Sequence, residues 1–372
     1  MKPKELLVVF LQALFMRLLL FFVSQGRHLT PDSLGYIELA RKLALNGSFS
    51  ELGRTPGYPM FLLLFKSVPI AIMVQAVAGS ITCVATSLSA WLLWRRTQWA
   101  VLAGLLMAFD PASILHCNML ITETLYTCVF TLGVSMLISA LHFDGRELFN
   151  FIQSSYMFGM ASFIRPIGVL YPPALAAAIA FFWQGNYARR RMLYLFAAMS
   201  MMLPGAWMLR NKISQGKAAF CVMQKFDLSP RVAHPKRYAV EMVSDTAKIF
   251  LGHASELVAW MVLHDDRYDP IKPQESPQGH FAGTRQLLKL HPTLAFFALG
   301  YVLCLLLVYL SAAEGFNLAR TYGQLPHAMI PLSVIVYHVL VTVVFTSAYY
   351  RQRVPIMPSI CILAARGKGA KV

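Results

Sequence analysis

The residue with the clearest chemical potential is a carboxylate just after the first apolar stretch: Asp32, in the segment PDSLGY at residues 31–36. A carboxylate at a membrane boundary is costly to desolvate, so it usually has a partner or a task. In a structural role, Asp32 would cap the following amphipathic helix or favour its dipole from the first turn. In a catalytic role, Asp32 would be a general base that deprotonates an acceptor hydroxyl. The two roles are compatible, since a helix end would hold the carboxylate in place.

Two further acids flank the second expected outer turn. Asp110 ends one apolar stretch and Glu123 begins the next. Structurally, Asp110 could cap a turn and Glu123 could pair with an arginine. Functionally, either acid would face Asp32 across a cavity, where it would coordinate a cation or orient an acceptor. Glu123 is favoured as the second catalytic acid because it lies in an otherwise apolar helix. Asp110 and His116 are then candidate substrate-binding residues, although a lone histidine is more often structural.

Five arginines are expected on the same side of the membrane as these acids: Arg54, Arg165, Arg210, Arg351 and Arg353. A guanidinium presents a fixed fork of N–H donors that matches phosphate oxygens, and it would stabilise charge that develops on a leaving phosphate. In the alternative role, some of these side chains only extend to lipid headgroups. Arg351 and Arg353 fit that alternative least, because they directly precede the last apolar stretch on a side otherwise poor in arginine.

Tyrosines accompany the charged groups: Tyr36, Tyr58, Tyr349 and Tyr350. They suit a membrane-interface belt, and Tyr36, Tyr58 and Tyr350 are also candidates for stacking on a bound sugar. No glycine-rich phosphate loop, HExxH, GxSxG or Asp-x-Asp motif is present. A cofactor is therefore not predicted, and a requirement for a divalent cation stays open.

Composition decides which class of protein positions these residues. Of the 372 residues, 57% are hydrophobic and 13% are charged, against about 45–50% and about 25% in a soluble domain. This excludes a soluble fold and predicts an all-α polytopic membrane protein. The net charge of +16 is assigned to cytoplasmic loops, so no nucleic acid is expected as a partner. The six scattered cysteines are expected to be small buried side chains.

Apolar stretches predict about ten membrane spans, within a range of eight to twelve. They lie near 5–24, 69–94, 97–115, 119–141, 151–164, 167–183, 192–209, 292–312, 325–347 and 354–366. Basic residues gather on one side of this arrangement, which the positive-inside rule makes cytoplasmic. The chain then divides into a transmembrane module (1–210) with outer-face catalytic helices in its first loop (25–68), an outer helical loop or cap (211–291), and C-terminal spans with a cytoplasmic tail (292–372).

Local patterns refine this organisation. Residues 32–46 have apolar side chains at near-helical spacing, and Asn46-Gly47 provides a stop. Residues 60–65 are apolar but too short to span, so we expect them in the membrane interface. Arg165-Pro166 predicts a break between two short apolar helices, and helix-like stretches lie near 238–263 and 280–290.

Five stretches, in this order, resemble the GT-C glycosyltransferases, specifically the bacterial family-39-like group related to protein mannosyltransferases. They are residues 32–36 through 54–59, 110–111 through 122–124, 163–166, 203–204 through 210–211, and 350–358. The resemblance covers the membrane part of the chain. It implies an enzyme that faces away from the cytoplasm, uses a polyprenyl-phosphate sugar donor and inverts the anomeric centre.

The resemblance also implies roles for single residues. Asp32 matches the catalytic acid of the first loop, and Glu123 matches the region of the second acidic position. Arg351 and Arg353 match the basic pair where the lipid phosphate would bind. The sequence departs from the family at Ser33, where many relatives carry a second adjacent acid, which leaves open any metal site that needs both acids.

The expected partners are a polyprenyl-phosphate-linked sugar, membrane lipids, and an acceptor that is a glycan, a lipid or a protein. Since no organelle retrieval signal is evident, we expect a bacterial inner membrane protein with its site facing the periplasm. One alternative is a lipid or glycolipid transporter or flippase, and another is a scaffold subunit with a degenerate site. A transporter predicts internal repeats and helices broken at mid-membrane. No repeat is visible and the acids cluster at one surface, which favours the enzyme.

Overall fold

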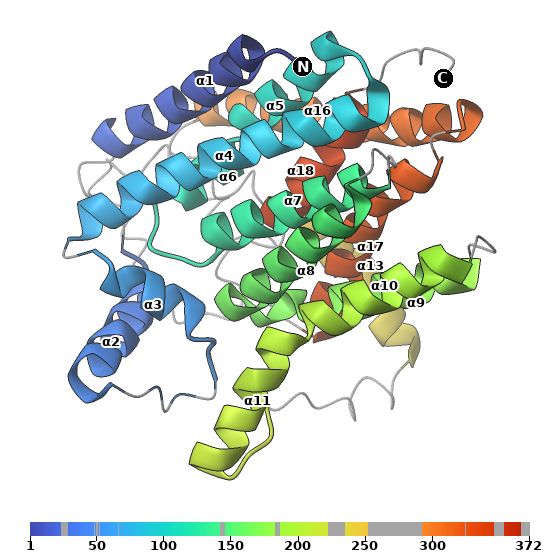
Figure 1. The fold of residues 1–372 in the computed structure, drawn as a ribbon. Coiled ribbons are helices and arrows are strands. Elements are labelled where there is room, and N and C mark those ends of the chain that lie inside the picture. The colour runs from blue at the N-terminus through green and yellow to red at the C-terminus, as the bar shows by residue number, and fades with distance from the viewer. Residues whose placement is uncertain are drawn as a thin grey trace.

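The structure is a computed structural model, and every regular element in the part of the chain that it describes is a helix (Figure 1). The described residues are 1–23, 29–47, 49, 51, 53–65, 67–141, 146–182, 187–221, 235–251, 292–323, 325–345 and 353–365. The expected all-α class is confirmed.

The helices that support the site are α1 (Pro3–Val23), α4 (Val68–Trp94), α5 (Thr97–Ala108), α7 (Glu123–Ala140) and α8 (Glu147–Ile164). α4 packs against α1, α5 and α7, and α7 packs against α8 (Figure 1). Small side chains allow these close approaches, since α4 buries alanine, serine, threonine and glycine along its length. A side chain added at Gly104 would collide with Ser87 and Val9, so α5, α4 and α1 meet there without spare room.

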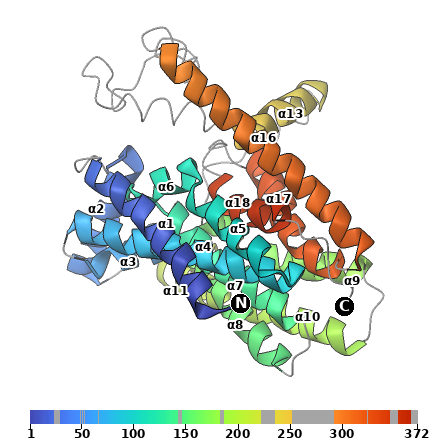
Figure 2. The ribbon, with the colours of Figure 1, turned by 90° about the horizontal axis from the view of Figure 1, so that it is seen from above.

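The chain after α8 adds the buried helix α18 and an extension of the bundle. Its helices are α9 (Tyr171–Phe182), α10 (Tyr187–Ser200), α11 (Met202–Gln215), α13 (Pro235–Leu251), α16 (Pro292–Thr321), α17 (Leu325–Phe345) and α18 (Arg353–Ala364). α18 is buried over its whole length and contacts α4, α5, α7, α16 and α17. α16 extends beyond the other helices with α13 beside it (Figure 2), where Tyr309 Oη donates to the Phe250 carbonyl oxygen at 2.9 Å.

The chain is an integral membrane protein. Five helical stretches among the described residues are long and apolar enough to cross a membrane: Pro3–Val23, Val68–Trp94, Glu123–Ala140, Arg191–Gln215 and Leu299–Thr321. Thr97–Ala108 and Pro111–Cys117, bent by 55°, make a sixth if they form one span. Shorter apolar helices occur at Pro166–Ala178, His327–Val343 and Arg353–Ala364. The expected number of about ten spans stays a prediction.

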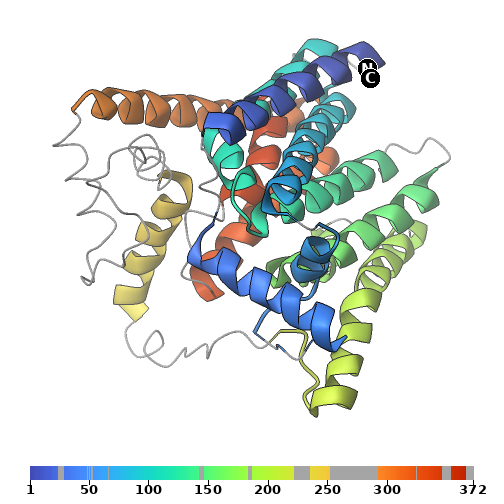
Figure 3. The same ribbon diagram turned by 90° about the vertical axis from the view of Figure 1, so that its left-hand side faces the viewer.

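Two short helices of the first loop lie at one end of α4: α2 (Pro31–Asn46) and α3 (Gly57–Leu63). Figure 3 looks onto this end and shows α2 running across it. The helix at α2 was expected from the apolar spacing of residues 32–46, whereas α3 overlaps the short apolar segment expected in the membrane interface at residues 60–65. The stop at Gly47 is also confirmed: its φ of 61° is left-handed, which glycine adopts at little cost, and its N–H donates to the Leu43 carbonyl.

Other local expectations have mixed outcomes. The break at Arg165-Pro166 is confirmed, since α8 ends at Ile164 and a 3-10 turn, η1, covers Pro166–Gly168. α13 confirms part of the helix expected near 238–263, while the stretch near 280–290 lies outside the described residues. Of the six cysteines, all free, four are buried as expected, but Cys304 is exposed and Cys221 is intermediate.

Candidate active site

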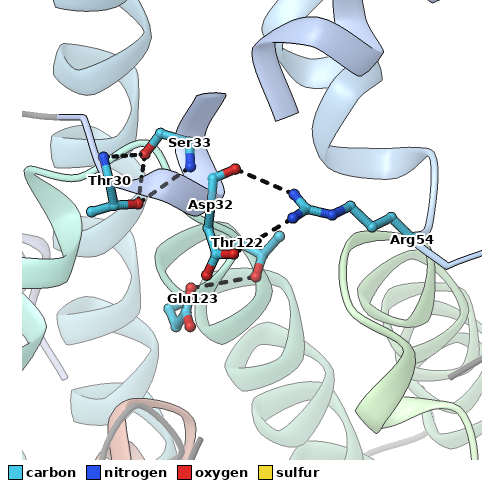
Figure 4. Close-up of polar contacts among 6 residues, drawn as sticks. All are labelled: Thr30, Asp32, Ser33, Arg54, Thr122 and Glu123. Carbon is cyan, nitrogen blue, oxygen red and sulfur yellow. Dashed lines mark hydrogen bonds and ion pairs between the residues drawn. The ribbon is translucent and has the colours of Figure 1, made fainter. Parts of the chain in front are cut away.

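The Asp32 carboxylate is held at the start of α2. Thr30, not Asp32, is the N-cap: its Oγ1 accepts from the Ser33 backbone N–H at 3.2 Å, and Ser33 Oγ accepts from the Thr30 N–H at 2.9 Å. Asp32 is therefore an acid of the first helical turn, where the helix dipole favours its charge. Arg54 Nη1 donates to the Asp32 carbonyl at 3.2 Å, and Arg54 Nη2 lies 3.5 Å from Asp32 Oδ1 (Figure 4).

Arg54 reaches Asp32 by lying across α2. Its Cζ is 4.3 Å from the centre of the Tyr36 ring, a cation–π contact. Gly35 leaves space for the guanidinium, since a side chain there would begin 3.0 Å from Arg54 Nη1. The Arg54 side chain is 31% exposed and that of Asp32 is 44% exposed. The carboxylate is thus oriented by its neighbour and still open to solvent.

A second acid–arginine pair lies deeper. Glu123 is in the first turn of α7, and its Oε1 is 3.0 Å from Nη1 of Arg165, at the end of α8. The geometry makes this an ion pair without a hydrogen bond. Thr122 Oγ1 donates to Glu123 Oε2 at 3.3 Å (Figure 4). The expectation that Glu123 pairs with an arginine is confirmed, and the side chains are 3% and 14% exposed.

Both pairs lie near enough to Tyr36 to influence the pKa of its hydroxyl, and we call these four side chains the Asp32 cluster. Burial raises the pKa of Tyr36, and the carboxylates of Glu123 and Asp32 raise it further. Arg54 and Arg165 oppose that effect. Tyr36 is therefore a neutral hydrogen-bond donor beside two acids and two cations.

Tyr58 connects this cluster to the bundle. Its ring meets that of Tyr36 edge-on, with centres 4.9 Å apart. Burial, followed by the charge of Glu123, raises the Tyr58 pKa well above its usual range. Tyr58 Oη donates to Gln75 Oε1 at 2.7 Å. Nearby, Thr55 Oγ1 donates to the Ile164 carbonyl at 3.1 Å, which fastens the segment after Arg54 to the end of α8.

Asp110 and Arg353 form a separate, fully buried pair. Asp110 caps α6 (Pro111–Cys117): its Oδ2 accepts from the Ser113 backbone N–H at 2.9 Å and from Ser113 Oγ at 2.6 Å. Its Oδ1 is 2.7 Å from Arg353 Nη2, which also lies 2.6 Å from Tyr301 Oη. Arg353 Nε and Nη1 have no hydrogen-bond partner in the described chain. The expected cap at Asp110 is confirmed, while phosphate binding by Arg353 stays a prediction.

The remaining candidates have local contacts or lie outside the described residues. His116 is buried, with Nδ1 2.8 Å from the Ala112 carbonyl of its own helix. Arg210 lies over the Trp207 ring at 4.8 Å and donates to Asn211 Oδ1 at 3.0 Å. The residues expected to matter at 349–351, namely Tyr349, Tyr350 and Arg351, are not described. Within the described ranges, no group of three metal-ligating side chains lies together.

Two buried polar residues were missed in the sequence. Arg17 is buried in α1, where Nη1 donates to the Ala13 carbonyl at 3.0 Å and Nη2 lies 3.6 Å from Cys83 Sγ. Gln75 is buried in α4. Each is a strongly polar side chain inside a long apolar stretch, a signal that by itself indicates a partner or a function.

No family model matches the sequence, and no curated protein matches it. Among solved structures, the chain is similar to ArnT from Cupriavidus metallidurans in the apo state, with a TM-score of 0.49 and 14% identity over 96% of this chain and 76% of that one. For the same enzyme bound to undecaprenyl phosphate, the TM-score is 0.48, with 15% identity over 98% and 77%.

The apo oligosaccharyltransferase of Archaeoglobus fulgidus gives a TM-score of 0.59 and 12% identity, over 98% of this chain and 50% of that chain. At this identity the likeness shows the fold alone. The chain is thus a helical membrane protein with the GT-C fold, as its first-loop and C-terminal motifs led us to expect. It spans half the length of the oligosaccharyltransferase chain.

Proposed function

We propose that this protein is an integral-membrane glycosyltransferase. It moves a sugar from a polyprenyl-phosphate donor to an acceptor on the non-cytoplasmic face and inverts the anomeric carbon. The observation that carries the proposal is Asp32: a half-exposed carboxylate on a first-loop helix, oriented by Arg54 and clustered with the Glu123–Arg165 pair.

Asp32 is the general base of this reaction. Its exposure lets an acceptor hydroxyl approach, and its place in the first turn of α2 fixes the direction of approach. As the acceptor oxygen bonds to the anomeric carbon, the bond from that carbon to the phosphate oxygen breaks. The acceptor proton passes to Asp32, and the products are the glycosylated acceptor and polyprenyl phosphate.

Arg165 and Arg54 hold the phosphate of the donor. Both lie in the Asp32 cluster, and Arg165 Nη1 donates no hydrogen bond to any residue that the structure describes. Guanidinium N–H groups aimed at the leaving phosphate stabilise its charge as the bond breaks. Glu123 then sets the position of Arg165 and balances its charge before the donor binds. Arg351 and Arg353 remain further candidates for the phosphate, on the resemblance.

The test is transfer from a panel of radiolabelled polyprenyl-phosphate sugars by the purified protein in nanodiscs, with and without EDTA. Asp32→Asn is expected to lower transfer by about 10²–10⁴-fold, the usual contribution of a general base. The matched control is Glu38→Gln, an exposed acid on the same helix paired with Lys42. Near wild-type transfer by folded Asp32→Asn would refute the base. Lipid movement in liposomes without transfer would favour a flippase instead.

A further inference from the structure

Gln75 connects the two halves of the candidate site through a single side-chain amide. We infer that Gln75 is a positioning residue, which sets Glu123 relative to Asp32 by fixing the turn between α6 and α7. The inference rests on the proposed function, in which these two acids act together. It concerns a residue that touches neither acid.

The amide of Gln75 is completely buried and both of its ends are used. Oε1 accepts from Tyr58 Oη at 2.7 Å. Nε2 donates to the carbonyl oxygens of Cys117 at 3.0 Å and Met119 at 2.8 Å. Both amide N–H groups are therefore engaged. Through Gln75, α4 is bonded to α3 on one side and to the α6–α7 turn on the other.

The two carbonyl groups belong to the segment that delivers Glu123. Cys117 is the last residue of α6, and Met119 lies in the turn that leads to the first residue of α7. Carbonyl groups at a helix end have no partner within the helix, so a buried end needs one from elsewhere. Gln75 provides that partner, and Glu123 follows Met119 by only four residues. Movement of the turn would move the acid.

The other end of the amide leads to Asp32. Tyr58 packs edge-on against Tyr36, and the Arg54 guanidinium lies over the Tyr36 ring. Arg54 in turn bonds the carbonyl and carboxylate of Asp32. These contacts form an unbroken path from one acid to the amide. Because catalytic groups must be held to within about 0.5 Å, such a path has a direct effect on rate.

Glutamine is the residue type that this place requires. It accepts at one end and donates twice at the other without a charge. Glutamate would place a carboxylate against the carbonyl oxygens of Cys117 and Met119, which cannot donate to it. Leucine would make none of the three hydrogen bonds that Gln75 makes to Tyr58, Cys117 and Met119.

The first measurement is independent of activity: hydrogen–deuterium exchange of the purified protein in nanodiscs. Gln75→Leu is expected to speed exchange of the amides at 118–123 by about tenfold, since the turn loses both bonds from Gln75. The matched control is Ser80→Ala, also buried in α4, whose hydroxyl donates to the Ala76 carbonyl of the same helix at 2.8 Å. Unchanged exchange at 118–123 in Gln75→Leu would overturn the inference.

The second measurement is a double-mutant cycle on the transfer rate. Gln75→Leu is expected to lower kcat by roughly 10- to 100-fold with little change in the KM of the donor, as for a displacement of about 1 Å. In the Glu123→Gln background, Gln75→Leu should lower kcat by less than about threefold, because Gln75 acts through Glu123. If the kcat loss of the double variant equals the product of the two single losses, Gln75 does not act through Glu123, and the inference is overturned.

A milder variant guards against misfolding. Tyr58→Phe removes one hydroxyl and keeps the ring contact with Tyr36, so it should show the same pattern with a smaller loss. If the wild type transfers no sugar, the proposed function fails. The exchange at 118–123 then still decides whether Gln75 fixes the turn.

Discussion

The Arg54–Asp32 and Arg353–Asp110 pairs use the same two side-chain types in opposite surroundings. In the first, the nitrogen and oxygen are 3.5 Å apart and the side chains are 31% and 44% exposed. In the second, they are 2.7 Å apart and the exposures are 0% and 1%. Both arginines also lie over tyrosine rings, Tyr36 and Tyr301.

The difference separates a group that can react from a group that holds helices together. An exposed pair adds at most about 1 kcal/mol to stability, and its members stay available to a ligand. A buried pair costs free energy to desolvate, yet removing one member leaves a charge without a partner. Asp32 thus stays accessible to a ligand, whereas Asp110 ties the break between α5 and α6 to the start of α18.

The largest expected effect is the loss of activity when the exposed acid, Asp32, is replaced. Asp32→Asn should lower kcat by about 10²–10⁴-fold, because the amide cannot accept the acceptor proton. Its thermal unfolding temperature should match that of the wild type, since the lost pair is exposed. Transfer assays and scanning fluorimetry on the same preparation provide both numbers. If Asp32→Asn is strongly destabilised, the exposed pair also supports stability, and it no longer differs from the buried pair in this respect.

The next effect concerns stability. Arg353→Met should lower the free energy of unfolding by about 3–5 kcal/mol, because the buried Asp110 carboxyl group would lose its cationic partner. The double variant Arg353→Met/Asp110→Asn should recover part of this loss. Denaturant unfolding in detergent measures both. If the single variant unfolds like the wild type, the buried pair does not hold α18.

A smaller effect depends on pH. Burial and the nearby carboxylates raise the folded-state pKa of Tyr36 above its unfolded value of about 10. The neutral hydroxyl therefore contributes stability that is complete below pH of about 10 and is lost as the pH rises through the folded pKa. In Tyr36→Phe, the free energy of unfolding should fall less steeply with rising alkaline pH than in the wild type. Unfolding is followed by fluorescence. Identical alkaline profiles would show that Tyr36 ionises freely in the folded protein.

The smallest effect is expected at a third pair, which is more exposed than the other two. Glu38 and Lys42 lie 3.7 Å apart on α2 with side chains 52% and 58% exposed. Glu38→Gln should change stability by no more than about 0.5 kcal/mol and leave transfer intact. A large loss of transfer in this variant would mean that any acid on α2 affects the site, and Asp32 would lose its special place.

Features set by neighbouring residues could be predicted from the sequence. The helix from Pro31 to Asn46, its stop at Gly47 and the break after Ile164 all follow from proline, glycine and apolar spacing. The cap at Asp110 is equally local. The all-α membrane class follows from composition, because no soluble surface can be built from so few charged residues.

Features that join distant segments could not be predicted in this way. Phosphate binding by Arg353 stays a prediction, but its contact with Asp110 could not be foreseen, because the two residues are 243 positions apart in the sequence. Gln75 likewise bonds residues 17 to 44 positions away. Periodicity and capping signals describe one helix at a time and contain no information on which helix lies opposite.

The arginine inside the first helix has a consequence for how the chain is made. An arginine inside a span raises the free energy of membrane insertion, by about 2.5–3.5 kcal/mol at the centre and less toward the ends, and the apolar residues of α1 must offset this cost for Arg17. Its nitrogens meet Cys83, and a side chain at Gly79 would collide with it. Packing of α4 against α1 therefore helps to shield the Arg17 charge from lipid, and we expect this shielding to favour pairing of the first two spans during insertion.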